Sequence, residues 1–260
     1  PKDSVLVVLG FSRFAEPTVM TVMTVMTGAT QARPGRFQAR PSPDHLIRFL
    51  KGCPVRILNL YAGVGGNRLK WDGPRPDVVA VEWDPKIADV YQRLFPGDEV
   101  VVADAHQYLL DHGHEFDFIW SSPPCQSHSR MVKGGRNRKP RYPAMALYEE
   151  VLYLQHFAKV PWIVENVVPY YEVLIPAKKV GRHLFWSNFE FDVEDVPPPS
   201  GFIHQERVNK QDLMDWLGIY YEGNVYYDGN HCPFQVLRNC VHPDVGAQIL
   251  DAAFPQVLGA

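Results

Sequence analysis

The clearest chemical signal in the sequence is a cysteine mounted behind two prolines. Pro123 and Pro124 precede Cys125, which opens a polar stretch. Proline fixes φ and removes a backbone N–H, so the pair forms a stiff, non-helical mount for the thiol. A thiol at the point where an apolar run gives way to a polar loop is typical of a partly accessible nucleophile. We expect nucleophilic chemistry at Cys125, with Glu165 at the end of a later apolar run facing the same cleft.

A glycine-rich turn at residues 63–66 follows the apolar run 56–60. Such a turn lets the backbone approach a ligand, and we expect it to open a helix whose N-terminus favours a carboxylate or phosphate, although a simple tight turn has the same pattern. Glu82 lies about 20 residues further on, where doubly wound folds place an acid on a ribose. Asp104 ends the next apolar run and could accept a bond from an adenine amino group.

The glycine-rich turn, Glu82 and Asp104 together indicate a nucleoside pocket. Alternatively, each of the two acids is a solvated carboxylate at the start of a helix. The glycine order GxGG, rather than GxGxxG, favours S-adenosylmethionine over a nicotinamide cofactor.

Residues 127–141 form a polar loop that carries many cations and no acid after Arg130. A charge run of this kind is usually a solvated face, but this one adjoins the cysteine and could bind the phosphates of a polyanion. The residues that we assign to nucleic-acid binding are Ser127, Arg130, Lys133, Arg136, Arg138, Lys139 and Arg141.

Short apolar runs alternate with helical stretches in the part of the chain that carries these groups. We expect strands at residues 56–60, 77–81, 99–103, 116–120 and 162–164, and helices at 85–95 and 143–159. This alternation predicts βαβ units and a mostly parallel, doubly wound α/β sheet. Each chemically suggestive group follows a strand, and open α/β sheets bind ligands at that edge. The sequence therefore predicts one site there.

The composition is that of an ordinary globular protein. The chain has 260 residues, 46% of them hydrophobic, and a formal net charge of -3. These values exclude a wholly disordered or fibrous chain and suit one α/β domain with a small second lobe. No window approaches the length of a membrane span and no cleavage pattern follows the N-terminal apolar run, so we expect a cytoplasmic protein. Residues 18–26 repeat Thr-Val-Met and residues 32–43 are rich in Arg and Pro; we assign no chemistry to them.

Four cysteines are present, and we expect reduced thiols rather than disulfides in a chain of this length. Cys232 and Cys240 lie near His231 and His242, but without a CxxC spacing no metal site is expected.

In their order, these motifs resemble those of the cytosine carbon-5 DNA methyltransferases, especially the short phage and bacterial forms. The resemblance covers roughly residues 55–255 and depends most on PPCQ at 123–126 together with ENV at 165–167. Its other parts are NLYAGVGGN at 59–67, VEWD at 81–84, RHLFWSN at 182–188 and RNCVHPDVGAQIL at 238–250. The chain departs from the family pattern at Asn59, where Asp is usual, and in the arginine motif, where only Arg182 is clear.

The resemblance implies a Rossmann-like fold that uses S-adenosylmethionine and releases S-adenosylhomocysteine. It places the catalytic domain at residues 51–188, a small target-recognition region at 189–236 and a returning segment at 237–260, with 1–50 as an extension. The residues that it assigns to the cofactor are Tyr61, Ala62, Gly63, Gly65, Gly66, Glu82, Trp83, Asp104, Ala105, Pro124, Asn239 and Val241.

The resemblance also implies a reaction. Cys125 would add to carbon 6 of cytosine, and Glu165 would bond or protonate ring nitrogen 3. Asn166 would position its segment, and Arg182 would bond the carbonyl of the base. Inside a duplex the target carbon is inaccessible, so the base would have to flip out.

The expected partner is double-stranded DNA, bound by a monomer, and a restriction endonuclease as a further partner stays open. The alternatives are a tRNA cytosine-5 methyltransferase on the same scaffold and an inactive nucleic-acid-binding homologue. A nicotinamide-dependent oxidoreductase and a small-molecule methyltransferase fit the motifs less well. The aromatic residues of the recognition region would form a small core or a DNA-facing surface: Trp216, Tyr220, Tyr221, Tyr226 and Tyr227.

Overall fold

The computed structural model describes residues 54–72, 76–130, 142–202, 207–227 and 232–254. All of them belong to one unit of the chain, Phe37–Ala260. The Thr-Val-Met repeat, the Arg/Pro-rich stretch and most of the basic loop lie outside these ranges.

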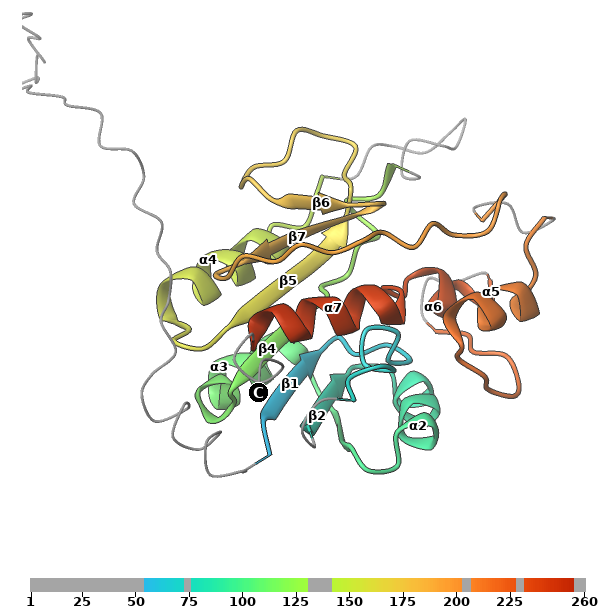
Figure 1. The fold of residues 1–260 in the computed structure, drawn as a ribbon, viewed down its shortest axis with the longest axis horizontal. Coiled ribbons are helices and arrows are strands. Elements are labelled where there is room, and N and C mark those ends of the chain that lie inside the picture. Colours follow the sequence, from blue (N-terminus) through green and yellow to red (C-terminus); the bar gives the residue numbers. More distant parts are fainter. Residues whose placement is uncertain (1–53, 73–75, 131–141, 203–206, 228–231, 255–260) are drawn as a thin grey trace, which may run out of the picture. The chain divides into compact units, whose positions relative to one another are not determined.

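A seven-stranded sheet organises the described residues (Figure 1). Its strand order is β3-β2-β1-β4-β5-β7-β6. The first five strands in this order are parallel, whereas β7 runs antiparallel to both β5 and β6. The strands are β1 (Arg56–Leu60), β2 (Asp77–Glu82), β3 (Glu99–Val102), β4 (Phe118–Ser121), β5 (Trp162–Val167), β6 (Lys178–Val180) and β7 (His183–Ser187). The expected doubly wound, mostly parallel α/β sheet is confirmed.

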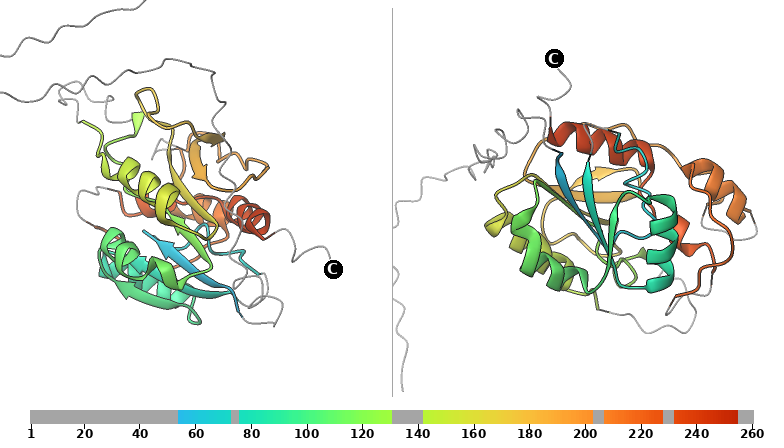
Figure 2. Two further views of the ribbon diagram at one scale, coloured as in Figure 1. Left: turned by 90° about the vertical axis from the view of Figure 1, so that its left-hand side faces the viewer. Right: turned by 90° about the horizontal axis from the view of Figure 1, so that it is seen from below.

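Helices cover both faces of this sheet (Figure 2). One face packs against α3 (Ala105–His112) and α4 (Ala146–Phe157) through Leu58, Leu60 and their neighbours. The alternate residues of the same strands, among them Ile57 and Phe118, pack against α7 (Pro243–Ala253). The second face also carries α2 (Pro85–Leu94), and the short helix η1 (Gly113–Glu115) follows α3. Alternation along each strand therefore builds two apolar layers, as expected for a buried parallel sheet.

The strand order changes direction between β1 and β4, which makes this the topological switch point of the sheet. From β1 the chain builds outward to β2 and β3, and it then returns to place β4 and β5 on the other side. Open α/β sheets bind ligands outside the carboxyl ends of the strands at such a switch point. The segment after β1 is the glycine-rich turn, and the segment after β4 carries Cys125. The fold therefore brings the two chemical motifs of the sequence to the place where a ligand site forms.

Two local expectations were wrong. The glycine-rich turn opens no regular helix, because Tyr61, Gly63 and Gly65 have φ of +54°, +57° and +79°, which interrupt helical geometry. The strand expected to end at Val164 continues through Glu165 to Val167, because residues 163–167 of β5 all pair with β7. Glu165 therefore lies within a strand.

Residues between β7 and α7 form a small helical region with α5 (Lys210–Leu217) and α6 (Gln235–Arg238). Its buried side chains, including Leu213 and Leu237, pack against Val64 of the glycine-rich turn and Ile87 of α2. The aromatic residues expected there have mixed roles: Tyr221 is buried, Trp216 packs at the edge of the cluster, Tyr227 is half-buried, and Tyr220 and Tyr226 are exposed.

Among the described residues, no helix has the length and apolar character of a membrane span. Cys125, Cys232 and Cys240 form no disulfide, and within the same residues no group of three or more His, Cys, Asp or Glu side chains could hold a metal ion.

Candidate active site

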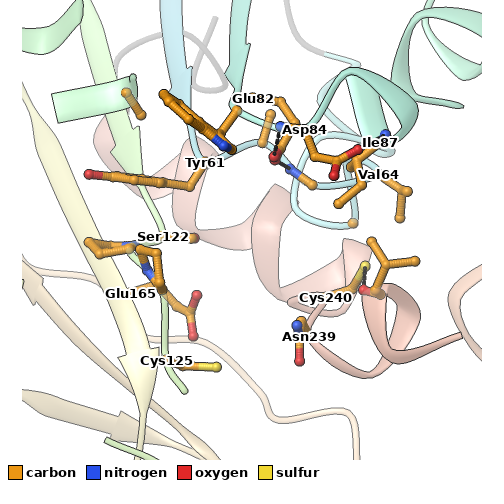
Figure 3. A pocket seen from close by; sticks show the side chains of 18 of the residues that line it. Tyr61, Val64, Glu82, Asp84, Ile87, Ser122, Cys125, Glu165, Asn239 and Cys240 are labelled. Carbon is orange, nitrogen blue, oxygen red and sulfur yellow. Dashed lines mark hydrogen bonds between the residues drawn. The ribbon is translucent and has the colours of Figure 1, made fainter. Parts of the chain in front are cut away.

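A cavity of about 400 Å³ opens at the carboxyl edge of the sheet. Its volume lies in the range of small-molecule and cofactor sites. The segments after β1, β2, β3 and β4, the end of β5 and the segment between α6 and α7 all contribute to its wall. Figure 3 shows side chains from these segments around a common space. One cavity therefore gathers residues that lie up to 180 positions apart in the chain.

The glycine-rich turn approaches this cavity with its backbone. An added Cβ at Gly63 would meet no atom within 4 Å, so the turn leaves open space on the cavity side. At Gly66 the situation is the opposite, since a Cβ there would lie 2.5 Å from Cβ of Cys240 and 2.7 Å from the carbonyl oxygen of Val241. The absence of a side chain thus serves ligand access at Gly63 and close packing at Gly66.

Two acids and a tryptophan stand at the ends of β2 and β3. The Glu82 carboxylate accepts hydrogen bonds from the backbone N–H of Gly63 at 2.9 Å and of Asp84 at 3.0 Å. It is therefore not the solvated helix-start carboxylate of the alternative interpretation; Asp84 caps α2 instead. Burial raises the pKa of Glu82. Trp83, beside it, lines the cavity with 71% of its surface exposed.

The position of Asp104 agrees with both roles that the sequence left open, a carboxylate at a helix start and a cofactor-binding acid. It is exposed and caps α3 by accepting a hydrogen bond from the backbone N–H of Gln107 at 2.8 Å. It also lines the cavity together with Ala105.

The segment after α6 closes the opposite wall of the cavity. Asn239, Cys240 and Val241 line it, and Asn239 donates a hydrogen bond to the Tyr227 hydroxyl at 3.3 Å. Tyr227 lies in the same wall. The C-terminal segment therefore returns to the glycine-rich turn through direct contact.

Cys125 is held by backbone contacts on both sides. Asn166 donates a hydrogen bond from its side chain to the Pro123 carbonyl oxygen at 2.9 Å, which ties the proline pair to β5. The Cys125 carbonyl accepts from the backbone N–H groups of His128 and Ser129, both at 3.0 Å. These contacts form a turn directly after the thiol and fix the backbone of Cys125.

The electrostatic surroundings of Cys125 oppose its ionisation. Burial and the nearby Glu165 carboxyl raise the pKa of the thiol to about 11, whereas the Arg182 guanidinium lowers it. A thiol is a weak nucleophile until it loses its proton. Activation of Cys125 thus depends on its charged neighbours.

Glu165 lies beside Cys125 in the wall, and both side chains face the same space (Figure 3). The Glu165 side chain is buried and pairs with His183, whose Nδ1 lies 2.5 Å from Oε1. His183 was absent from the residues predicted from sequence. The contact between His183 and Glu165 follows from the antiparallel pairing of β7 with β5, which no local sequence pattern indicates.

Arg182 lies behind this wall and does not line the cavity. Its guanidinium donates to the Cys240 carbonyl oxygen at 2.8 Å and stacks over the Phe202 ring at 4.7 Å. The structure therefore joins Arg182 to the returning C-terminal segment.

A buried acid that the sequence analysis missed supports the cavity from α4. The Glu150 carboxylate accepts hydrogen bonds from Tyr61 at 3.0 Å and from Ser121, and it lies 3.1 Å from Nδ1 of His106. Tyr61 in turn lines the cavity. Glu150 lies among the buried residues of α4, and no local sequence pattern marked it as part of the site.

The structure brings together most of the residues predicted for the site. All the predicted cofactor residues except Gly65 line the cavity, as do Cys125 and Glu165; Asn166 and Arg182 lie behind its wall. Ser127 accepts a hydrogen bond from Ala144 and Arg130 donates to Pro169, and neither lines the cavity. Lys133, Arg136, Arg138, Lys139 and Arg141 lie outside the described residues. The wall residues that the sequence analysis did not assign are Val64, Asn67, Asp84, Ile87, Ser122, Pro123, Gln126, Val167, Tyr227, Val236 and Cys240.

Comparison with known proteins agrees with this architecture. The crystal structure of the Dnmt2 methyltransferase from S. pombe matches 79% of this chain and 99% of its own with a TM-score of 0.50 at 13% sequence identity. That likeness concerns the fold. A second solved structure, a DNMT2 mutant from Spodoptera frugiperda, has 26% identity and a TM-score of 0.31 over 44% of this chain and 35% of its own.

The chain is also similar to a family of methyltransferases and to one of the curated proteins. The family model of the C-5 cytosine-specific DNA methylases matches residues 55–167. A human tRNA (cytosine(38)-C(5))-methyltransferase is 32% identical over 87 residues, which span 32% of this chain and 22% of that protein.

The cavity fits the methyl donor of this family, S-adenosylmethionine. The open backbone at Gly63, the half-buried Glu82 carboxylate and the exposed Trp83 ring provide space, a polar group and an aromatic surface for a nucleoside.

Proposed function

We propose that this protein transfers a methyl group from S-adenosylmethionine to carbon 5 of a cytosine in nucleic acid, with Cys125 as the nucleophile. The observation that supports this most is that Cys125 and Glu165 share one cavity with the glycine-rich turn. A nucleophile, an acid and a nucleoside site in one space are what this chemistry requires.

Cys125 performs the first step. Its thiolate adds to carbon 6 of the ring, and the electron density that develops makes carbon 5 nucleophilic. The pKa of about 11 means that the free site keeps the thiol protonated at neutral pH. Arg182, which lowers the pKa of Cys125, favours the thiolate.

Glu165 stabilises the charge that this addition creates. Its carboxyl group bonds ring nitrogen 3 and donates a proton there, which requires the acid to be neutral when the base binds. Asn166 supports both groups, because it lies in β5 next to Glu165 and bonds the carbonyl of Pro123.

S-adenosylmethionine supplies an electrophilic methyl group on a sulfonium sulfur. Glu82, Trp83, Asp104 and the turn at Gly63 would hold it, and Asn239 and Val241 would close the opposite side. The carbon-5 proton then passes to water, the bond between the Cys125 sulfur and carbon 6 breaks, and 5-methylcytosine is released.

We propose DNA as the substrate, in agreement with the description of the matching family. The target base would have to leave the duplex to reach Cys125, at a cost of a few kcal/mol. The cations of residues 130–141 would bind backbone phosphates and offset this cost. The name of the human relative favours tRNA as a second candidate.

One experiment tests both. The purified protein is incubated with labelled S-adenosylmethionine and either duplex DNA or tRNA, and transfer is compared with that of Cys125→Ser. We expect methylation of DNA that is abolished in C125S, with affinity for S-adenosylmethionine nearly unchanged. Transfer to tRNA alone would favour the second candidate, and substantial turnover by C125S would exclude Cys125 as the nucleophile.

A trapping experiment examines the covalent step itself. DNA that carries 5-fluorocytosine should accumulate a covalent adduct with the wild-type protein, because fluorine cannot leave as the proton does. The adduct should map to Cys125 by peptide mass spectrometry.

A further inference from the structure

We propose that His183 is the positioning residue of Glu165: it holds one carboxyl oxygen and shares a proton with the acid, so that the two side chains together carry no net charge while Cys125 reacts. This inference rests on the proposed function, since it assigns a partner to the acid of that reaction. The two side chains are named below as the acid–imidazole pair, Glu165 and His183.

The geometry of the pair comes from the antiparallel register of β5 and β7. Glu165 pairs with Phe185, and Val167 pairs with His183. Glu165 and His183 are therefore diagonal neighbours on one face of the sheet, within reach of long side chains. Their ring nitrogen and carboxyl oxygen lie 2.5 Å apart, and both residues are buried, with 5% and 7% of their surfaces exposed.

The bond at Oε1 leaves the second oxygen of Glu165 for the base. Within the described residues no hydrogen bond is formed by Oε2, and Glu165 lines the cavity beside Cys125. A carboxyl held by one oxygen presents the other in a fixed direction, which a catalytic acid needs. His183 itself does not line this cavity, so it acts through Glu165.

His183 is held in turn by its own surroundings. Its ring stacks on Phe185 with an interplanar angle of 25° and a centroid distance of 6.1 Å. On its far side it borders a second, small cavity between β7 and α7. The contacts that orient the ring are therefore the bond to Glu165 and the stacking on Phe185.

Charge neutralisation is the reason that the pair matters for Cys125. The Glu165 carboxyl raises the pKa of the thiol, because a negative charge disfavours a second one nearby. When the pair holds one proton, on either partner, its net charge is zero and this opposition disappears. Without an ionisable partner, Glu165 would oppose the thiolate whenever it is ionised.

Other charged or titratable groups also face the pair. They are Cys125 after β4, Arg182 before β7, Asp195 and His242 around the second cavity, and Cys240 after α6. Arg182 is a fixed cation at neutral pH, so it offsets part of the charge of Glu165 but cannot exchange a proton with it.

The proton returns at the end of each cycle. It moves from Glu165 to ring nitrogen 3 as the bond between the Cys125 sulfur and carbon 6 forms. It moves back when that bond breaks. The acid–imidazole pair therefore ends with the proton with which it began, and the separate proton that carbon 5 loses passes to water.

The test measures Cys125 directly, without nucleic acid. The rate of its alkylation by iodoacetamide is followed at pH 8 by peptide mass spectrometry in the wild type, His183→Asn, Glu165→Gln and the double variant. Asparagine keeps a donor near Nδ1 but cannot bind a proton. We expect H183N to slow alkylation about tenfold, equivalent to one unit in the pKa of Cys125, and E165Q/H183N to recover the rate of E165Q.

The control is His156→Asn, an exposed histidine of α4 whose Nδ1 bonds the Leu152 carbonyl; its alkylation rate should equal that of the wild type. Thermal unfolding checks each variant, and His183→Gln replaces H183N in the same assay if H183N does not fold. Unchanged alkylation in H183N would overturn the inference. So would a slow rate that E165Q does not restore, because it would mean that His183 only supports the fold.

This design separates the two proposals. If the wild-type protein methylates neither DNA nor tRNA, the proposed function fails, whereas the alkylation series still decides whether His183 controls Cys125. If methylation occurs, H183N should lower kcat at saturating S-adenosylmethionine while the affinity for this cofactor stays unchanged.

Discussion

Substitution of Gly66 by alanine tests whether close packing of the C-terminal segment holds the glycine-rich turn. An added Cβ would lie 2.5 Å from Cβ of Cys240 and 2.7 Å from the carbonyl oxygen of Val241. Both distances are below 3.0 Å, which real Cβ atoms essentially never show. Neither neighbour is the end of a flexible side chain, so one of the two backbone segments has to move.

The expected magnitude follows from two opposing effects. Overpacking a buried site costs about 1–3 kcal/mol, and the contact with main-chain atoms places G66A near the upper limit. Replacing glycine by alanine also restricts the unfolded chain, which stabilises the protein by about 0.4–1 kcal/mol. The net loss is about 2 kcal/mol, which should lower the Tm by about 4–8 °C for a domain of this size.

Gly97→Ala is the matched control, because an added Cβ there meets no atom within 4 Å. It makes the same change to the unfolded chain, so its Tm should equal or slightly exceed that of the wild type. Thermal unfolding measures both variants, and calorimetric titration measures S-adenosylmethionine affinity. The affinity of G66A should fall because Asn239, Cys240 and Val241 line the cavity. A G66A protein that melts within about 2 °C of G97A would refute the packing argument.

Three further predictions concern single groups. Alkylation of Cys125 should continue to accelerate with pH to about 11, whereas a plateau near pH 9 would show that the thiol is not desolvated. Glu150→Gln should lower the pKa of His106, which the hydrogen bond to Glu150 raises above 6.5; an NMR titration measures it. Because the folded-state pKa of His106 is raised, its stabilising contribution is complete below about pH 6.5 and is lost as the pH rises through that folded value, so E150Q should lose more Tm at pH 5.5 than at pH 8. Trp83→Ala should weaken S-adenosylmethionine binding about three- to tenfold, the equivalent of one aromatic contact, and leave the Tm unchanged because the ring is exposed; an unaltered Kd would remove Trp83 from the cofactor site.

Sequence reasoning located the parallel strands because their apolar runs are short and end in turn residues. The expected strand at residues 56–60 has the bounds of β1, and the second and third expected strands differ from β2 and β3 by one residue. The fourth was shifted by two residues at its start, since pairing with β1 begins at Phe118. Parallel strands are buried on both faces, so their apolar runs are continuous and easily recognised.

The turn after β1 could not be predicted in the same way. Glycine allows positive φ but does not require it, and only the structure shows that Gly63 and Gly65 adopt it together with Tyr61. For Tyr61, which has a Cβ, such a conformation is uncommon. Its hydroxyl bonds Glu150 of α4, a contact between residues 89 positions apart that no local pattern contains. Long-range contacts therefore decided the conformation that local propensity left open.

The same limit explains why His183 was missed. The sequence argument placed functional groups after strands, since the carboxyl ends of parallel strands share one edge of the sheet. In a strand that runs the other way, the residue at that edge is the first one. β7 is antiparallel to β5 and begins at His183, so its N-terminal residue meets Glu165 at the edge where the parallel strands end. A search for site residues in a mixed sheet should therefore examine the carboxyl ends of the parallel strands and the amino ends of the antiparallel ones.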